Sequence, residues 1–269
     1  MKQTSGIERT SIAQDPFTVV KLDGTAPAMI ICDHASRHIP ASYGDLGLPQ
    51  SELARHIAWD IGAGEVARRL AGLLDAPAVL CGTSRLVIDC NRPFAAASSI
   101  PSSSDGVPIP GNAAIGAAER QRRIDRYFRP YHEEISRQIQ VRLKRGQTPT
   151  LVSIHSFTPV MNGIQRPWHV GLLWDREQQP AAAIIRELRR DPALVVGENQ
   201  PYEGTNPRGY ALDAHAADNG LPIAVFEIRQ DLIHTAQGGG PLGPYSGHGF
   251  TPHTGGICWR TIGPVHLVD

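Results

Sequence analysis

The sequence has no excess of charge of either sign, and few of its residues are aromatic. Its 26 Lys and Arg residues balance 26 Asp and Glu residues, so the formal net charge is zero. Surfaces that bind nucleic acid or an anionic membrane are usually basic. The composition therefore gives no electrostatic reason to expect either kind of partner.

Long apolar runs and paired cysteines are also missing. The longest apolar runs are well short of the roughly 20 residues that a membrane span needs. Residues 1–17 lack the apolar core of a secretory signal. None of the four cysteines forms a C-x-x-C pair, and three lie in or beside apolar runs, which favours buried, reduced thiols. We therefore expect a soluble, cytoplasmic protein; its cysteines are Cys32, Cys81, Cys90 and Cys258.

Short apolar runs alternate along the chain with longer stretches of helical periodicity. This alternation predicts an α/β fold in one domain, residues 1–269, with helices on both faces of a sheet. Two segments do not fit the pattern: residues 92–111 are rich in Ser, Pro and Gly and predict a long surface loop, and residues 235–269 are rich in Gly and Pro and form an atypical tail. The predicted strands are 28–33, 77–82, 85–91, 150–157, 169–175, 193–199 and 224–230, and the predicted helices are 51–76, 118–146 and 180–190.

Polar residues follow or interrupt four of these apolar runs. In open α/β sheets, functional groups gather where strands end and loops begin. A carboxylate also lies inside an apolar stretch, HIAWDIGA, where it needs a partner. The residues concerned are Asp33, His34, Asp89, Asn91, Arg92, His155, Ser156, Glu227 and Arg229, together with Asp60.

This set of side chains is typical of a catalytic zinc site. Two imidazoles and a carboxylate leave a fourth zinc position for water, whose pKa zinc lowers to about 7. Such chemistry also needs a free carboxylate as general base and acid, and an arginine to stabilise the oxyanion. Glu227 and Arg85 could fill these two roles, and a further arginine could bind a substrate carboxylate.

Six segments of the sequence together resemble the N-formylglutamate amidohydrolase family. They lie in order across roughly residues 28–234 and read CDHASRHIP, SRLVIDCNRP, HSFTPVMNG, RPWHVGLLWDR, VGENQPY and AVFEIRQDLI. That family is similar to the zinc carboxypeptidases and aspartoacylases. The resemblance implies a mixed, mostly parallel central sheet flanked by helices, one bound zinc ion, and hydrolysis of an amide next to a carboxylate.

The resemblance also implies roles for individual residues. His34 and His155 match the two histidine ligands of the zinc, and Glu227 matches the general base. The segment from Asp89 to Arg92 resembles the D-x-N-R element of the carboxypeptidases, in which Asn91 and Arg92 would hold the substrate carboxylate.

The third zinc ligand departs from the wider superfamily, whose first ligand motif is H-x-x-E. Here Arg37 stands three residues after His34. We favour Asp60 because a carboxylate in an apolar stretch needs a partner, and a metal ion is a good one. Asp33 and His38 are the alternatives.

Three functions fit these observations. The first is zinc-dependent hydrolysis of a small N-acyl amino acid such as N-formylglutamate. The second keeps the zinc but cleaves short peptides or peptidoglycan fragments, with the loop at 92–111 bordering a wider cleft. The third is a non-catalytic relative that binds a metal or a ligand, which Arg37 and the unusual tail would favour.

Overall fold

The computed structural model describes residues 15–174, 179–202 and 209–233. The predicted tail at 235–269 and Cys258 lie outside these residues. No helix of the described part combines the length and the apolar character needed to cross a bilayer.

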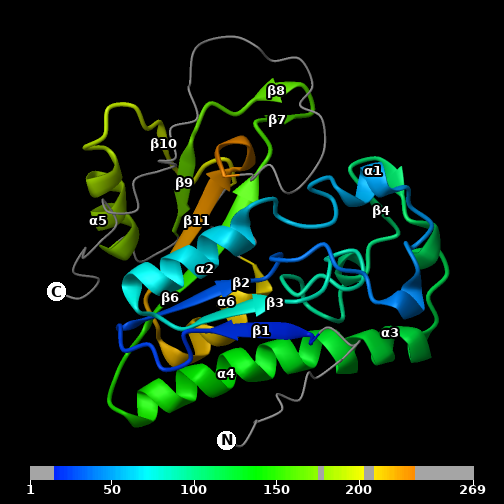
Figure 1. Ribbon diagram of the computed structural model, residues 1–269, viewed down its shortest axis with the longest axis horizontal. Helices are drawn as coiled ribbons and strands as arrows, with labels where there is room; N and C mark the ends of the chain where they lie inside the picture. Colours follow the sequence, from blue (N-terminus) through cyan, green and yellow to red (C-terminus); the bar gives the residue numbers. More distant parts are fainter. Residues whose placement is uncertain (1–14, 175–178, 203–208, 234–269) are drawn as a thin grey trace, which may run out of the picture.

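A mixed, mostly parallel sheet forms the centre of the molecule, as predicted (Figure 1). Its strand order is β1-β3-β2-β6-β11-β9-β10. The pairs β3–β2, β2–β6, β6–β11 and β9–β10 are parallel, whereas β1–β3 and β11–β9 are antiparallel. The strands are β1 (Phe17–Val20), β2 (Ala28–Cys32), β3 (Ala78–Cys81), β6 (Thr150–Phe157), β9 (Val170–Leu173), β10 (Val196–Glu198) and β11 (Ile223–Arg229).

Helices cover both faces of this sheet (Figure 1). Alternate residues of β2 point to opposite faces, so Met29 and Ile31 pack with α4, and Ala28 and Ile30 pack with α2. Every residue of β2 is fully buried, which explains its continuous apolar sequence. The helices are α1 (Gln50–Leu53), α2 (Ala63–Leu74), α3 (Ala117–Arg123), α4 (Arg129–Lys144), α5 (Gln179–Leu188) and α6 (Tyr210–His215).

Two short hairpins lie outside the central sheet. One joins β4 (Ser103–Ser104) to β5 (Val107–Pro108), and the other joins β7 (Val160–Met161) to β8 (Ile164–Gln165). The first belongs to the Ser- and Pro-rich segment that we predicted to be a loop.

The prediction of a strand at 85–91 is wrong. This apolar run is buried, but it is a series of turns that pairs with no strand in the described part of the chain. Side chains take the place of a neighbouring strand: Asn112 donates to the Leu86 carbonyl and Arg123 donates to the Val87 carbonyl. Because these bonds satisfy the buried backbone, the segment can curve and carry its polar residues toward the carboxyl edge of the sheet.

The long predicted helices are also interrupted. The pattern at 51–76 divides into α1 and α2, with a loop between them that contains Asp60. A π-helical turn at Ile124–Phe128 joins α3 to α4. Neither break was predicted, because the apolar spacing continues across both.

Candidate active site

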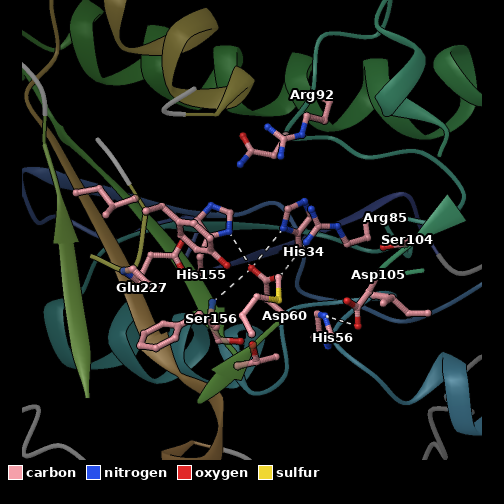
Figure 2. A pocket seen from close by; sticks show the side chains of 18 of the residues that line it. His34, His56, Asp60, Arg85, Arg92, Ser104, Asp105, His155, Ser156 and Glu227 are labelled. Atoms are coloured by element: carbon pink, nitrogen blue, oxygen red, sulfur yellow. Dashed lines mark hydrogen bonds and ion pairs between the residues drawn. The ribbon is translucent and has the colours of Figure 1, made fainter. Parts of the chain in front are cut away.

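The candidate site lies at the carboxyl ends of the parallel strands β2, β6 and β11. His34 follows β2, His155 lies near the end of β6, and Glu227 lies on β11. In open sheets of this kind, ligands bind outside the carboxyl ends of the strands. All three residues line a cavity of about 830 Å³ (Figure 2).

Asp60 reaches the site from the loop before α2, not from a helix as we had expected. Its backbone N–H donates to the His34 carbonyl at 3.0 Å, which ties the two segments together. Gly62 then adopts φ +81°, and a side chain there would meet the Ile233 carbonyl oxygen at 2.6 Å. A glycine is therefore required for the tight turn that leads from Asp60 into α2.

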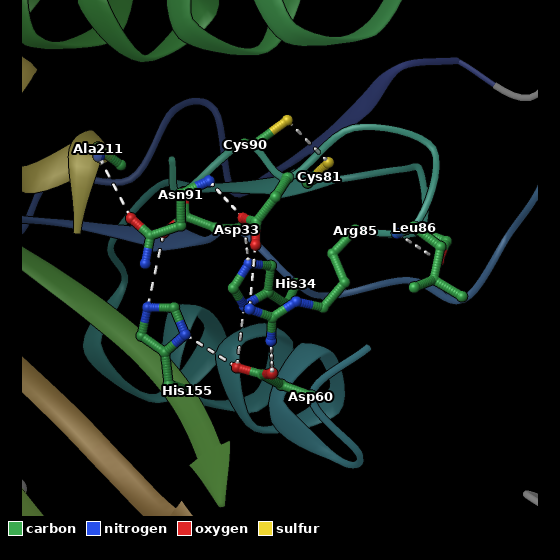
Figure 3. A network of polar contacts seen from close by, with 12 residues as sticks. Asp33, His34, Asp60, Cys81, Arg85, Leu86, Cys90, Asn91, His155 and Ala211 are labelled. Carbon is green, nitrogen blue, oxygen red and sulfur yellow. Dashed lines mark hydrogen bonds and ion pairs between the residues drawn. The ribbon is translucent and has the colours of Figure 1, made fainter. Parts of the chain in front are cut away.

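Asp60, His34 and His155 form the one group of potential metal ligands found among the described residues. The Nδ1 atom of His155 lies 2.8 Å from Asp60 Oδ2, and the Nδ1 atom of His34 lies 3.3 Å from the same oxygen (Figure 3). All three side chains are buried. Two imidazole nitrogens and one carboxylate oxygen thus converge on one point, the donor set that a catalytic zinc ion takes from a protein.

The second nitrogen of each imidazole faces a different buried carboxylate. Nε2 of His34 lies 2.7 Å from Asp89 Oδ1, and Nε2 of His155 lies 3.6 Å from Asp33 Oδ2. A metal-bound histidine generally directs its other nitrogen at such a partner, which fixes the tautomer and the ring orientation. Both histidines therefore have the surroundings of metal ligands.

Arg85 connects two of the carboxylates. Its guanidinium lies 3.3 Å from Asp60 Oδ1 and 3.0 Å from Asp89 Oδ2. Its side chain is partly exposed to the cavity. Arg85 thus lies beside the donor group, but its predicted role in oxyanion stabilisation stays a prediction.

The carboxylates of this cluster are held in the ionised form. Burial alone would raise the pKa of Asp60, but the two neighbouring imidazoles outweigh burial and hold the pKa well below its usual value. The pKa of Asp89 is lowered in the same way, with His34 and Arg85 opposing the effect of burial. The pKa of Asp33 is lowered by His155, His34 and Tyr131 despite burial.

The charges of the cluster suit a divalent cation. Three ionised carboxylates and one guanidinium leave a formal charge of −2 before the imidazoles are counted; the residues are Asp33, Asp60, Asp89 and Arg85. Burial would lower the pKa of His155, but Asp33 and Asp60 raise it well above its usual value, so a proton on His155 offsets part of this charge in the metal-free protein. A divalent cation with neutral imidazoles would balance the whole charge of −2 and release that proton. The residues present therefore fit a metal ion such as zinc.

Glu227 lies beside this cluster without belonging to it. It is the register partner of His155 on the adjacent parallel strand, so both side chains lie on the same face of the sheet. Its Oε2 atom is buried and finds no hydrogen-bond partner within the described residues. Burial raises the pKa of Glu227 to about 7, with Asp60 adding to the rise and His155 opposing it. A carboxyl group with such a pKa suits proton transfer at neutral pH.

The predicted carboxylate-binding residues also line the cavity. The Asn91 N–H donates to Asp89 Oδ1, which links the predicted substrate residue to the partner of His34. The Asn91 side-chain oxygen accepts a hydrogen bond from the Ala211 N–H at 3.3 Å (Figure 3). Arg92 extends into the cavity from the same segment (Figure 2).

Other histidines lie outside the donor group. His38, an alternative third ligand, is not part of it. His132 is buried and stacks on His215 with ring centroids 5.2 Å apart. Its Nε2 donates to the Cys90 carbonyl, so it supports the segment that carries Asn91. The three described cysteines are free and buried, as predicted.

The sequence did not predict the contacts that two residues, Asp33 and Tyr131, make in this site. Asp33 was considered only as a ligand, whereas it faces His155. Tyr131 was not considered at all, although its hydroxyl donates to Asp33 Oδ1 at 2.8 Å. The apolar spacing along α4 indicates that Tyr131 is buried, but no pattern in the sequence identifies its partner 98 residues away.

The chain is similar to known proteins over most of its length. No curated protein matches the chain. The chain is similar to the crystal structure of the gene product Atu2144 from Agrobacterium tumefaciens, with 36% identity, a TM-score of 0.77, and coverage of 83% of this chain and 88% of the other. It shares its fold with N-formylglutamate amidohydrolase from Ralstonia eutropha JMP134, with 24% identity, a TM-score of 0.62, and coverage of 81% and 86%. The family model described as N-formylglutamate amidohydrolase matches residues 26–234, and the chain therefore belongs to this family of amide-bond hydrolases.

Proposed function

We propose that this protein is a zinc-dependent amidohydrolase that cleaves the amide bond of a small N-acyl amino acid such as N-formylglutamate. The observation that carries the proposal is the convergence of both histidine Nδ1 atoms on Asp60 Oδ2. Membership of the amidohydrolase family supports the reaction type.

His34, Asp60 and His155 would hold the zinc ion. When bound, zinc acts as a Lewis acid toward the acyl oxygen and lowers the pKa of a water molecule. Asp89 would keep the imidazole of His34 in the neutral form that carries its proton on Nε2, because this carboxylate faces that nitrogen.

Glu227 would move the protons of the reaction. Its unpartnered Oε2 accepts a proton from the attacking water and delivers it to the nitrogen of the leaving amine. In the metal-free protein, burial holds this carboxyl group at a pKa of about 7, which supports its assignment as a group that exchanges protons near neutral pH.

Asn91 and Arg92 would bind the carboxylate next to the scissile amide. The Asn91 side-chain oxygen accepts the hydrogen bond of the Ala211 N–H, and its amide NH₂ group, which has no partner among the described residues, can donate to a substrate oxygen. The Arg92 guanidinium can give two parallel hydrogen bonds to a carboxylate. Arg85, which lies beside Asp60, would stabilise the oxyanion.

One observation favours a second candidate, a hydrolase of short peptides. The β4–β5 hairpin contributes Ser104, Asp105 and Gly106 to the wall of the cavity. A cavity of about 830 Å³ falls within the range of about 300–1,000 Å³ that accommodates drug-sized ligands. This volume is larger than a formylated amino acid requires.

A substrate panel separates the two candidates. Zinc-loaded protein would be given N-formyl-L-glutamate, N-acetyl-L-glutamate and a tripeptide with a free carboxyl terminus, and the release of primary amine would be measured. The first proposal expects the highest kcat/KM with one of the two N-acyl amino acids. Faster cleavage of the tripeptide would instead support the peptide hydrolase, and no release from any of the three would contradict both.

A further inference from the structure

Asp33 immediately precedes His34 but takes no part in holding it. Its carboxylate is 1% exposed and turns toward β6 and α4. Oδ1 accepts a hydrogen bond from the Tyr131 hydroxyl at 2.8 Å. Oδ2 has no hydrogen-bond partner among the described residues and lies 3.6 Å from Nε2 of His155 (Figure 3).

The imidazole of His155 thus lies between two carboxylates. Nδ1 faces Asp60 at 2.8 Å, and Nε2 faces Asp33 at 3.6 Å, where the contact is an ion pair longer than a hydrogen bond. Both carboxylates attract a proton, and Asp60 is the closer of the two. With a cation between Nδ1 and Asp60, the single proton of a neutral imidazole would lie on Nε2, on the side that faces Asp33. This tautomer leaves the lone pair of Nδ1 available to a cation.

Tyr131 holds Asp33 in this orientation. The tyrosine is fully buried on α4, and its hydroxyl donates to the carboxylate oxygen that does not face His155. The length of this bond, 2.8 Å, is that of a normal hydrogen bond from a hydroxyl, and the bond fixes one of the two carboxylate oxygens. The side chain of Asp33 therefore cannot rotate away from His155 without breaking this bond.

We propose that Asp33, held by Tyr131, is a positioning residue that fixes the orientation and tautomer of His155 for metal binding. It acts through His155 and contacts neither substrate nor metal. The inference rests on the proposed function, because it assigns to His155 the role of a zinc ligand.

Metal binding by variants of these two residues tests the inference. The affinity for Zn²⁺ would be measured by competition with a chromogenic chelator, and the ligand geometry by the visible absorption spectrum of Co²⁺-loaded protein. Loss of such an outer partner typically weakens metal binding about 10- to 100-fold, and we expect this for D33A. D33N should recover most of the affinity, because its amide oxygen can still accept the Nε2 proton.

The effect of Tyr131 is tested with a matched control. Y131F leaves Asp33 intact but without its hydroxyl partner, so we expect a smaller loss, about tenfold or less, and a changed Co²⁺ spectrum. Tyr127 is also buried and lies one turn earlier, but its ring packs against Tyr43. Y127F should therefore bind Zn²⁺ as the wild type does.

The outcomes separate this inference from the proposed function. If the wild type binds no Zn²⁺, both fail. If H155A loses Zn²⁺ while D33A and Y131F keep wild-type affinity and spectrum, only the positioning role is overturned. A drop in the stability of metal-free Y131F without any change in Zn²⁺ affinity would also overturn it, and if D33A does not fold, Y131F decides.

Discussion

Glu227 and His155 lie directly opposite each other on the neighbouring parallel strands β11 and β6. This register places an unpartnered carboxyl group beside a candidate metal ligand, on two rigid central strands. A shift of one residue would turn Glu227 to the other face of the sheet. The pairing of these strands therefore decides whether base and metal site can act on the same substrate.

Removing a donor of the cluster should abolish zinc binding. We expect H34A, H155A and D60A each to lose the metal, because two remaining donors rarely hold a catalytic zinc ion. H38A is the matched control, since His38 lies outside the donor group and should leave the zinc content unchanged. Metal analysis of the purified proteins checks this. Full zinc content in D60A together with loss in H38A would show that the third ligand is His38.

Replacing Glu227 should separate metal binding from turnover. We expect E227Q to retain zinc and to lose activity by about 10²- to 10⁴-fold, the usual contribution of a general acid–base group. Zinc content and kcat would be measured on the same preparation. Activity within a few fold of the wild type would exclude Glu227 as the base.

Glu227 should also lower the stability of the metal-free protein at high pH. Its pKa of about 7 in the folded protein exceeds the ordinary value of 4.5, so the folded state holds more protons between these values. The contribution of protonated Glu227 to the free energy of unfolding is complete below pH 4.5 and is lost as the pH rises through 7.

By pH 8 the ionisation of Glu227 should lower the free energy of unfolding by about 3 kcal/mol, because each unit of pKa shift corresponds to about 1.4 kcal/mol. E227Q cannot ionise, so urea unfolding should find it more stable than the wild type at pH 8 and similar at pH 4.5. If E227Q differs from the wild type in stability by the same amount at both pH values, the raised pKa of Glu227 is contradicted.

Arg92 should act on substrates through their carboxylate. We expect R92A to raise KM for an N-acyl amino acid about 10- to 100-fold, which corresponds to the roughly 1.5–3 kcal/mol of a hydrogen bond to a charged group. R92K should recover the activity only in part, because lysine cannot form the paired hydrogen bonds.

The control for Arg92 is a substrate whose carboxylate next to the scissile amide is replaced by a carboxamide. For this compound, wild type and R92A should have similar KM values. An equal loss with both substrates would mean that Arg92 supports the cavity instead of binding the carboxylate.

The fold was predictable where burial and periodicity agree. β2 and β6 are continuous apolar runs, and the structure places them at 28–32 and 150–157, close to or at the predicted bounds. The run at 85–91 has the same apolar character but forms turns, because Asn112 and Arg123 satisfy its carbonyl groups from distant parts of the chain. Apolar character alone cannot distinguish these two cases.

The site was predictable as a set of side chains but not as a network. Asp60 was found because a carboxylate in an apolar stretch needs a partner, and the structure groups it with His34 and His155. The partnership of Asp33 with Tyr131 depends on the packing of α4 under the sheet, which joins residues 98 positions apart. No local pattern encodes such a contact.

The most direct test of the account is a zinc titration of metal-free protein with N-formyl-L-glutamate as substrate. Release of glutamate should be absent without metal, should rise in proportion to added zinc, and should reach its plateau at one zinc ion per chain. Full turnover in the metal-free protein, or no turnover when one zinc ion is bound per chain, would contradict the proposed zinc-dependent hydrolysis of this substrate.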